Sequence, residues 1–266
     1  MTLLDVLSLS LFVALAYMTL IWLLSLARKD ASIVDVFWGL GFVFLAAVYF
    51  VLTDGFIGRK ILITCLVGFW GLRLSVYILW RNWGKGEDYR YRRWREQAGD
   101  RFWWTSLYQV FLLQGLLLWL ISAPILGAQF YELPGELTVG DLAGAIVWGI
   151  GFLFEAVGDW QLARFKADPA NQGKVMRSGL WAYTRHPNYF GDAAVWWGCF
   201  IIAAATMRGA WSVYGPLIMT GLLLKVSGVA LLERRQVETK PQYRDYIETT
   251  SAFIPWFPRR RPTQGE

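Results

Sequence analysis

Residues 179–192, GLWAYTRHPNYFGD, place the chain's only histidine beside an arginine, an asparagine, two tyrosines and an aspartate. Pro187 biases His186 away from helical geometry, so RHPN reads as a shaped entry into a helix. Asn188 and Asp192 then lie one turn apart near the helix start, where backbone N–H groups are unpaired and the helix dipole is positive. This end of a helix suits a phosphate-bearing ligand, although a lone histidine is more often structural than catalytic.

Two acids in an upstream apolar run extend this chemistry. Glu155 and Asp159 are four residues apart and share one face of a helix. Like charges at this spacing repel each other, so a cation or a hydrogen-bond donor should lie nearby. Arginine forks match phosphate groups, and aromatic rings stack on bases. The sequence therefore predicts a nucleotide site made of Glu155, Asp159, Arg164, Lys166, Arg177, Trp181, Tyr183, Arg185, His186, Asn188, Tyr189, Asp192, Arg234 and Arg235.

Asp35, in ASIVDVFWGLGF, is the only acid in the second, third and fourth long apolar runs. Desolvation favours the protonated form of a carboxyl group, which can then donate a hydrogen bond to a substrate carbonyl oxygen. An acid in the first turn of a helix also complements the helix dipole, and both interpretations of Asp35 stay open. Arg73 and Lys225 also lie in apolar runs, where long cations often reach toward the interface.

These residues sit in an unusually apolar chain. Of its 266 residues 56% are hydrophobic, 16 are tryptophan, and the mean hydropathy is +0.36. The two cysteines lie in apolar runs, and no Cys or His has metal-ligand spacing, so neither a disulfide framework nor a metal site is expected. About 20 apolar residues cross a bilayer as a helix. The fold class predicted is all-α and integral membrane, with seven transmembrane helices at 3–26, 32–52, 60–80, 105–126, 139–162, 190–206 and 211–232.

The loop charges predict the orientation of these helices. The loops after helices one, three and five and the C-terminal tail hold 21 Lys and Arg residues, whereas the remaining loops, counted with Lys60 at the start of helix three, hold three. A Lys/Arg excess marks the cytoplasmic side, so the N-terminus is expected outside and the C-terminus in the cytoplasm. The net charge of +6 is spread over separate loops, which indicates anionic membrane lipids as partners and no nucleic acid. No linker or repeat is evident, and a single membrane domain over 1–266 is expected.

Several segments resemble one known family. GLWAYTRHPNYFGDAAVWWG resembles the C-terminal motif of membrane steroid 5-alpha-reductases and their bacterial relatives, and LLERRQVETKPQYRDYIETTSAFIPWFP looks like that family's closing segment. EAVGDWQLARFK is similar to its helix-five nucleotide motif, and SIVDVFWGLGF to the N-terminal signature of the bacterial subgroup. Sterol C14-reductases and isoprenylcysteine methyltransferases carry close variants of RHPNY alone.

The resemblance implies NADPH as cofactor, bound by residues 139–258, and a hydrophobic substrate held by helices in residues 1–126. It implies NADPH-dependent reduction of the conjugated C=C of a 3-oxo-4-ene steroid or a similar lipid enone. In the animal enzymes a helix-two glutamate and a helix-three tyrosine hold the substrate's keto oxygen. Asp35 matches the glutamate by its place, whereas the tyrosine has no secure match: Trp70 falls near that position and Tyr77 lies two turns on.

Two other functions stay open. The first is an S-adenosylmethionine-dependent membrane methyltransferase of the isoprenylcysteine or phospholipid type, which shares the RHP-Y turn. Those enzymes commonly carry Glu-Glu before their last amphipathic segment, whereas this chain has Glu-Arg-Arg at 233–235. The second is a lipid-binding or transport protein, although no pair of interrupted helices in two related halves is evident. The expected location is the inner membrane of a bacterium, and the sequence does not indicate an oligomeric state.

Overall fold

The structure, a computed structural model, describes residues 1–226 and 229–259, without the side chains of residues 226, 230, 231 and 235. Within that part 79% of the residues are helical and none forms a strand. The prediction of an all-α fold is therefore confirmed. Thr184 and Ser251 form an isolated parallel bridge between two loops.

Five segments of the described chain are long and apolar enough to cross a membrane. They contain the first five of the predicted spans, and the protein is accordingly a multi-pass membrane protein. The five are α1 (Leu3–Arg28), α2 (Ile33–Leu52), α3 (Ile57–Asn82), the run Tyr89–Phe130 and α8 (Val139–Ala167).

The other two predicted spans are not among these five. Helix α9 (Pro187–Ala204) covers the prediction at 190–206. The prediction at 211–232 corresponds to α10 (Tyr214–Gly221), the π-helical turn η6 (Leu222–Val226) and the start of α11 (Val229–Thr239), and residues 227–228 lie outside the described residues. The seven-span count and the orientation of the termini therefore stay predictions.

The chain divides into two compact units. The first is Met1–Leu142 with Phe200–Gly215, and the second is Ala143–Cys199 with Pro216–Glu266. Each unit is described by itself below. Whether the chain acts as a single membrane domain stays a prediction.

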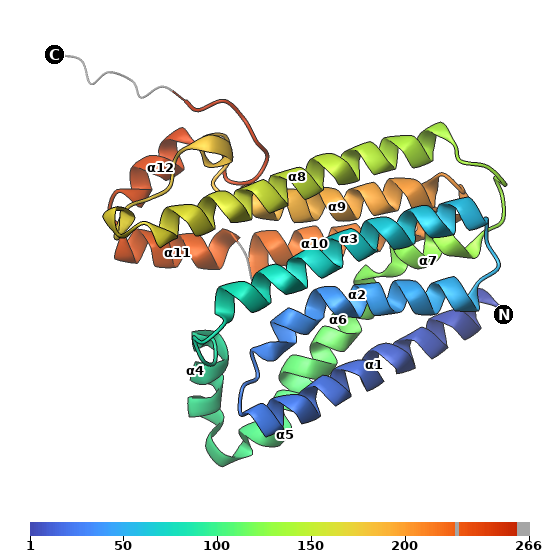
Figure 1. The fold of residues 1–266 in the computed structure, drawn as a ribbon, viewed down its shortest axis with the longest axis horizontal. Helices are drawn as coiled ribbons and strands as arrows, with labels where there is room; N and C mark the ends of the chain where they lie inside the picture. Colours follow the sequence, from blue (N-terminus) through green and yellow to red (C-terminus); the bar gives the residue numbers. More distant parts are fainter. Residues whose placement is uncertain (227–228, 260–266) are drawn as a thin grey trace. The chain divides into compact units, whose positions relative to one another are not determined.

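The first unit is built on the packing of α2 between α1 and α3 (Figure 1). The contact of α2 with α3 is close because two glycines face each other. A Cβ atom on Gly71 would lie 2.6 Å from the carbonyl oxygen of Gly39. Small residues at a crossing let two membrane helices approach each other closely. The remaining helices of this unit are α4 (Tyr89–Ala98), α5 (Phe102–Ser106), α6 (Leu113–Ile121) and α7 (Ala123–Phe130), with a π-helical turn at Leu107–Leu112.

A buried ion pair fixes the loop that leads into α8. Arg59 donates from Nε to Oδ1 of Asp141 at 2.7 Å and from Nη2 to Oδ2 at 3.0 Å. Both side chains are almost fully buried. Thr138 also donates to Asp141, and the acid lies in the first turn of α8, where a negative charge complements the helix dipole. The two charges therefore neutralise each other in an apolar region.

The second unit is built on close antiparallel packing of α8 against α9 (Figure 1). Glycines recur every seven residues on both helices. A Cβ on Gly191 would lie 2.5 Å from the carbonyl oxygen of Gly151, and a Cβ on Gly198 would lie 2.7 Å from that of Gly144. The backbones therefore touch along the seam, which sets the register of α9 against α8. Helix α12 (Tyr243–Thr249) completes this unit together with short 3₁₀ turns.

Candidate functional site

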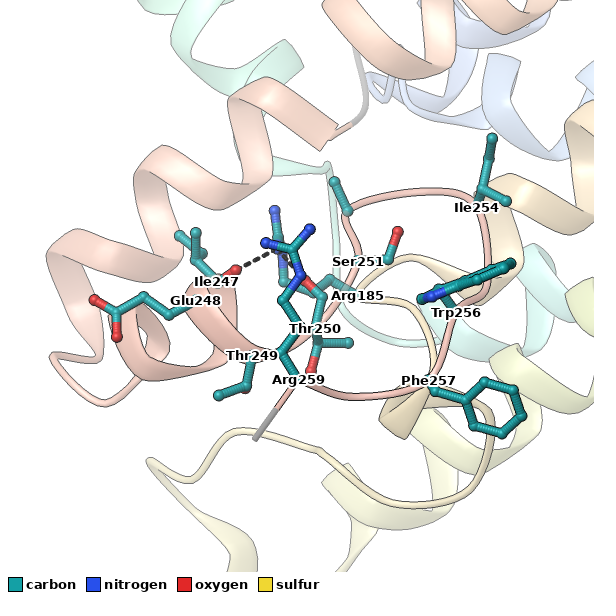
Figure 2. A pocket seen from close by; sticks show the side chains of 11 residues that line it. Arg185, Ile247, Glu248, Thr249, Thr250, Ser251, Ile254, Trp256, Phe257 and Arg259 are labelled. Carbon is teal, nitrogen blue, oxygen red and sulfur yellow. Dashed lines mark hydrogen bonds between the residues drawn. The ribbon is translucent and has the colours of Figure 1, made fainter. Parts of the chain in front are cut away.

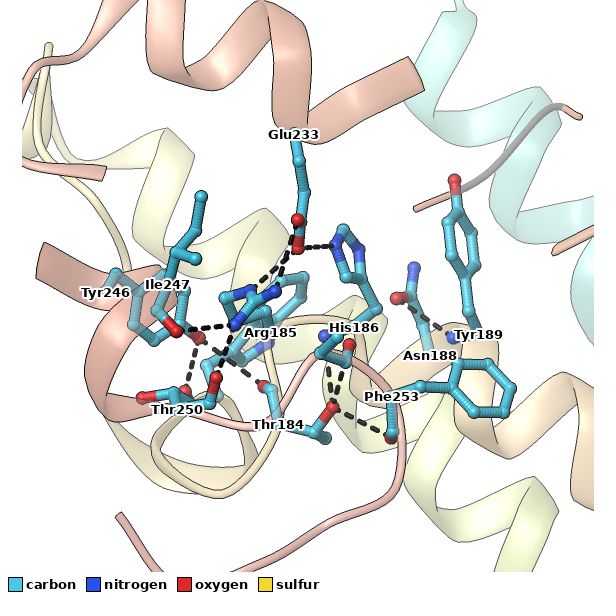
Figure 3. Close-up of polar contacts among 12 residues, drawn as sticks. Thr184, Arg185, His186, Asn188, Tyr189, Glu233, Tyr246, Ile247, Thr250 and Phe253 are labelled. Carbon is cyan, nitrogen blue, oxygen red and sulfur yellow. Dashed lines mark hydrogen bonds and ion pairs between the residues drawn. The ribbon is translucent and has the colours of Figure 1, made fainter. Parts of the chain in front are cut away.

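The RHPN turn is held by an arginine whose donors are bound inside the protein (Figure 3). Arg185 donates from Nε and Nη2 to the two carboxylate oxygens of Glu233, at 2.7 and 3.2 Å. Its Nη1 donates to the carbonyl oxygens of Ile247, at 3.0 Å, and of Thr250. The backbone N–H of Arg185 donates to Ser251 O at 2.9 Å. Arg185 thus ties the turn to α11 and to the end of α12.

His186 lies against the same carboxylate. Its Nε2 is 3.1 Å from Oε1 of Glu233, and its ring stacks on that of Tyr189, with centroids 5.5 Å apart and 6° between the planes. Burial acts to raise the pKa of Glu233, but hydrogen bonds from His186 and Arg185 outweigh it and hold that pKa below its ordinary value. An ionised carboxylate only accepts hydrogen bonds. His186 therefore donates to this carboxylate from Nε2.

Asn188 connects the turn to one of the two acids of α8. Its Nδ2 donates to Oδ1 of Asp159 at 3.1 Å, so the amide is a donor beside the acid pair. Glu155 and Asp159 are both buried, with exposed fractions of 3% and 7%. The close approach depends on Gly158, because a Cβ there would lie 3.2 Å from the backbone nitrogen of Asn188. The structure thus brings Asp159, Asn188, His186 and Tyr189 into one cluster at the start of α9.

The aromatic residues before the turn serve different roles. Trp181 is buried and donates from Nε1 to the carbonyl oxygen of Gly158 at 3.1 Å, and its own carbonyl accepts from the hydroxyl of Tyr246. Tyr183 is 43% exposed, and its ring packs edge-on against Phe257. Of the predicted stacking residues, Tyr183 is therefore accessible to a ligand, whereas Trp181 supports the fold of the turn.

The predicted cations are spread around this unit. Arg164 lies over the ring of Trp160 at 5.5 Å, beside a cavity of about 310 Å³ that Gln161 and Ser178 also line. Arg177 lies over Tyr246, also at 5.5 Å. Lys166 and Arg234 are exposed, Asp192 is half-buried on α9, and the side chain of Arg235 lies outside the described residues.

The first unit contains a second polar cluster, around Asp35. Nη2 of Arg90 lies 2.6 Å from Oδ2 of Asp35, and the hydroxyl of Tyr91 donates to Oδ1 at 2.7 Å. Nε2 of Gln114 is 3.5 Å from the hydroxyl of Tyr91. Both carboxylate oxygens of Asp35 therefore have a hydrogen-bond partner, and one of the partners is a cation.

Trp70 and Tyr77 occupy other positions on α3. Trp70 is fully buried, and Phe42 meets it edge-on at 5.6 Å. Tyr77 is half-buried, with its ring 6.1 Å from that of Trp80 and below the guanidinium of Arg81. Neither residue is among the hydrogen-bond partners of Asp35 described above.

Sequence reasoning missed Tyr91, Arg90 and Glu233 as site residues. Tyr91 and Arg90 fall in a strongly basic segment that was interpreted as a loop. That segment forms α4, where Asp88 is the N-cap and accepts from the backbone N–H of Arg90, and Gly99 ends the helix with a φ of 54°. An Asp followed eleven residues later by a Gly is a recognisable helix start and stop. The sequence therefore contains the start and stop signals of α4, but it does not indicate that Arg90 and Tyr91 on this helix contact Asp35.

The fold and these clusters define an all-helical, multi-pass membrane protein with polar sites among its helices. The chain belongs to the family described as "Protein of unknown function (DUF1295)", which matches residues 21–250 and is a membrane protein family related to steroid 5-alpha-reductases, within a superfamily of reductases and methyltransferases. The chain is 24% identical over 268 residues to the Schizosaccharomyces pombe protein named "Uncharacterized protein C594.04c". The similarity covers 88% of this chain and 75% of that protein. No solved structure matches the chain.

Proposed function

We propose that the protein is an NADPH-dependent reductase that reduces the conjugated C=C of a 3-oxo-4-ene steroid or a similar lipid enone, in the inner membrane of a bacterium. The family's relationship to steroid 5-alpha-reductases supports the reaction class. The observation that carries the proposal is the hydrogen bond from Tyr91 to Asp35, at 2.7 Å. It pairs a tyrosine with an acid, as the animal enzymes do, although Tyr91 lies on α4 and their tyrosine lies in helix three.

The residues of the second unit suit a dinucleotide with an additional phosphate. Asn188 and the acids Glu155 and Asp159 offer donors and acceptors for an amide and for ribose hydroxyls. Arg164 and Lys166 carry positive charge at the end of α8. The cavity beside Arg164 has a volume near the lower limit for ligand pockets, so it fits part of a dinucleotide, such as an adenosine phosphate. When bound, NADPH would supply the hydride.

The chain's own residues supply the polar chemistry at the substrate carbonyl. As hydride reaches the β-carbon, negative charge develops on the keto oxygen, and a hydrogen-bond donor there lowers the barrier. Tyr91 has a single hydroxyl hydrogen, which it gives to Asp35 in the structure, and on substrate binding it would turn this hydrogen to the keto oxygen. The carboxylate of Asp35 and the guanidinium of Arg90 hold the phenol in place. Asp35 is thereby a positioning residue, which changes the role that the sequence predicted for it.

Purified protein in detergent tests this proposal. NADPH binding is measured by titration calorimetry, and turnover with a 3-keto-4-ene steroid is followed by NADPH absorbance and by mass spectrometry of the product. We expect NADPH to bind more tightly than NADH, and the product to gain two hydrogens. Binding of S-adenosylmethionine without binding of NADPH would establish the methyltransferase alternative, and binding of neither would exclude both enzymes.

A further inference from the structure

A cavity of about 420 Å³ lies in the second unit, beside the segment that follows α12 (Figure 2). Two guanidinium-bearing residues line it, Arg185 and Arg259, together with the hydroxyl residues Thr249, Thr250 and Ser251. This composition offers N–H and O–H donors to a ligand with several acceptor oxygens.

The charge of this cavity is unbalanced. Glu233 neutralises Arg185 by the bidentate contact described above. Arg259 forms no ion pair within residues 1–226 and 229–259, and its backbone N–H donates to Thr249 O at 2.8 Å. Glu248 also lines the cavity, but Figure 2 shows its carboxylate pointing away from the two arginines. The cavity therefore favours an anion.

Large apolar side chains surround the same cavity. Ile254, Trp256 and Phe257 are 66%, 70% and 75% exposed, respectively. Exposed apolar groups beside a basic site suit a ligand whose anionic part continues into hydrocarbon. Free inorganic phosphate would leave these three side chains uncovered.

The loop that carries Ile254, Trp256 and Phe257 also lies beside the last turns of α8, a membrane-spanning helix. Trp256 donates from its backbone N–H to Tyr183 O, and the RHPN turn packs on Gly158, within the last three turns of α8. Trp160 is exposed at the same level of α8. Exposed Trp and Tyr residues gather where a membrane protein crosses from hydrocarbon to headgroups. Basic residues at this level attract anionic lipids.

We propose that this cavity binds the phosphate of an anionic phospholipid headgroup, with Arg259 as its principal charged contact. Ser251 adds a hydroxyl contact, while Ile254, Trp256 and Phe257 lie among the adjoining acyl chains. The proposal is independent of the proposed reductase activity, because neither the ligand nor Arg259 takes part in that reaction.

The test uses full-length protein in detergent, titrated with phosphatidylglycerol and, separately, with phosphatidylcholine. Native mass spectrometry counts bound lipid and gives the dissociation constant. The variant is Arg259→Ala, and the matched control is Arg244→Ala, since Arg244 is exposed on α12 and does not line the cavity. Melting in the absence of added lipid checks that both variants fold.

We expect wild-type protein to prefer phosphatidylglycerol, and Arg259→Ala to raise its dissociation constant about ten-fold, as for loss of one charge-assisted hydrogen bond. Arg244→Ala should bind as wild type does. Equal binding by Arg259→Ala and wild type would overturn the proposal. Displacement of the lipid by millimolar inorganic phosphate or by NADPH would also overturn it, because the site would then be one for a soluble anion.

Discussion

Glu233 and Arg185 form a bidentate ion pair although they lie 48 residues apart in the chain. Through this pair the first residue of the RHPN turn is joined to α11. The same carboxylate also contacts His186, so one side chain orients two consecutive residues of the turn. The contact makes Glu233 the residue on which the geometry of the turn depends.

Replacing this acid should therefore loosen the turn. In Glu233→Gln the charge of buried Arg185 loses its partner, while its bonds to two carbonyl oxygens remain. We expect a loss of about 1–3 kcal/mol in the free energy of unfolding, measured as a lower melting temperature in detergent. Glu238→Gln, an exposed acid on the same helix, is the control. A wild-type melting temperature in Glu233→Gln would show that the ion pair adds no stability.

The same pair predicts how stability depends on pH. The pKa of Glu233 lies below its ordinary value of 4.5 in the folded protein, so the unfolded chain binds the proton first as the pH falls. The stabilisation is complete above pH 4.5 and disappears as the pH falls through the lowered pKa. Melting curves of wild type and Glu233→Gln should therefore differ at neutral pH and converge in acid. A difference that persists unchanged to low pH would contradict this assignment.

Removing the phenol oxygen next to Asp35 should affect chemistry more than cofactor binding. Tyr91→Phe deletes the proposed donor to the keto oxygen, and such losses cost about 10²–10³ in kcat. We expect turnover of the steroid to fall by that factor at saturating NADPH, with an unchanged dissociation constant for NADPH. Tyr89→Phe, which alters a tyrosine of the same helix, is the control. Unchanged turnover in Tyr91→Phe would transfer the role to another donor.

The amide at the start of α9 should contribute to nucleotide affinity. Asn188→Ala removes the 3.1 Å contact between the two side chains, and Asp159→Asn removes the negative charge of its acceptor. If both groups also bind the cofactor, each variant should raise the dissociation constant for NADPH about ten-fold, as expected for a lost hydrogen bond to a charged group. Calorimetry measures this change. A lower melting temperature with unaltered affinity would leave the pair a structural contact.

Bulk at the seam between α8 and α9 should separate these helices. In Gly191→Ala the new Cβ would lie 2.5 Å from the carbonyl oxygen of Gly151, so one backbone must shift. Overpacking of this kind costs about 1–3 kcal/mol, and the melting temperature should fall accordingly. Gly149→Ala is the matched control, since a Cβ there meets nothing within 4 Å. Equal melting temperatures for the two variants would contradict the close contact.

The sequence predicted the helical class and the first five spans because long apolar runs report directly on membrane helices. It also predicted that a donor would accompany the acids of α8, and Asn188 supplies one to Asp159. Both inferences rest on local properties, namely hydropathy and the charge of neighbouring side chains. The nucleotide itself stays a prediction.

Contacts between distant segments were beyond the sequence. Arg185 was interpreted as a phosphate ligand because its type suits one, yet its donors are bound to Glu233 and to the carbonyl oxygens of Ile247 and Thr250. Asp35 is expected from its type to donate to a substrate carbonyl, and the fold places Arg90 and Tyr91 on its two carboxylate oxygens. The type of a side chain limits the hydrogen bonds that it can form, whereas the fold determines which partners lie within reach of it.

The seven-residue glycine spacing in α8 and α9 has a consequence for how this unit tolerates insertions and deletions. An α-helix turns by about 100° for each residue. One residue added to α9 between Gly191 and Gly198 would rotate one glycine out of the seam while the other stayed in it. Asn188 would then face away from Asp159, or Gly198 would no longer meet Gly144. We therefore expect the loops to tolerate changes in length and α9 not to, because the spacing of its glycines keeps the RHPN turn beside the acids of α8.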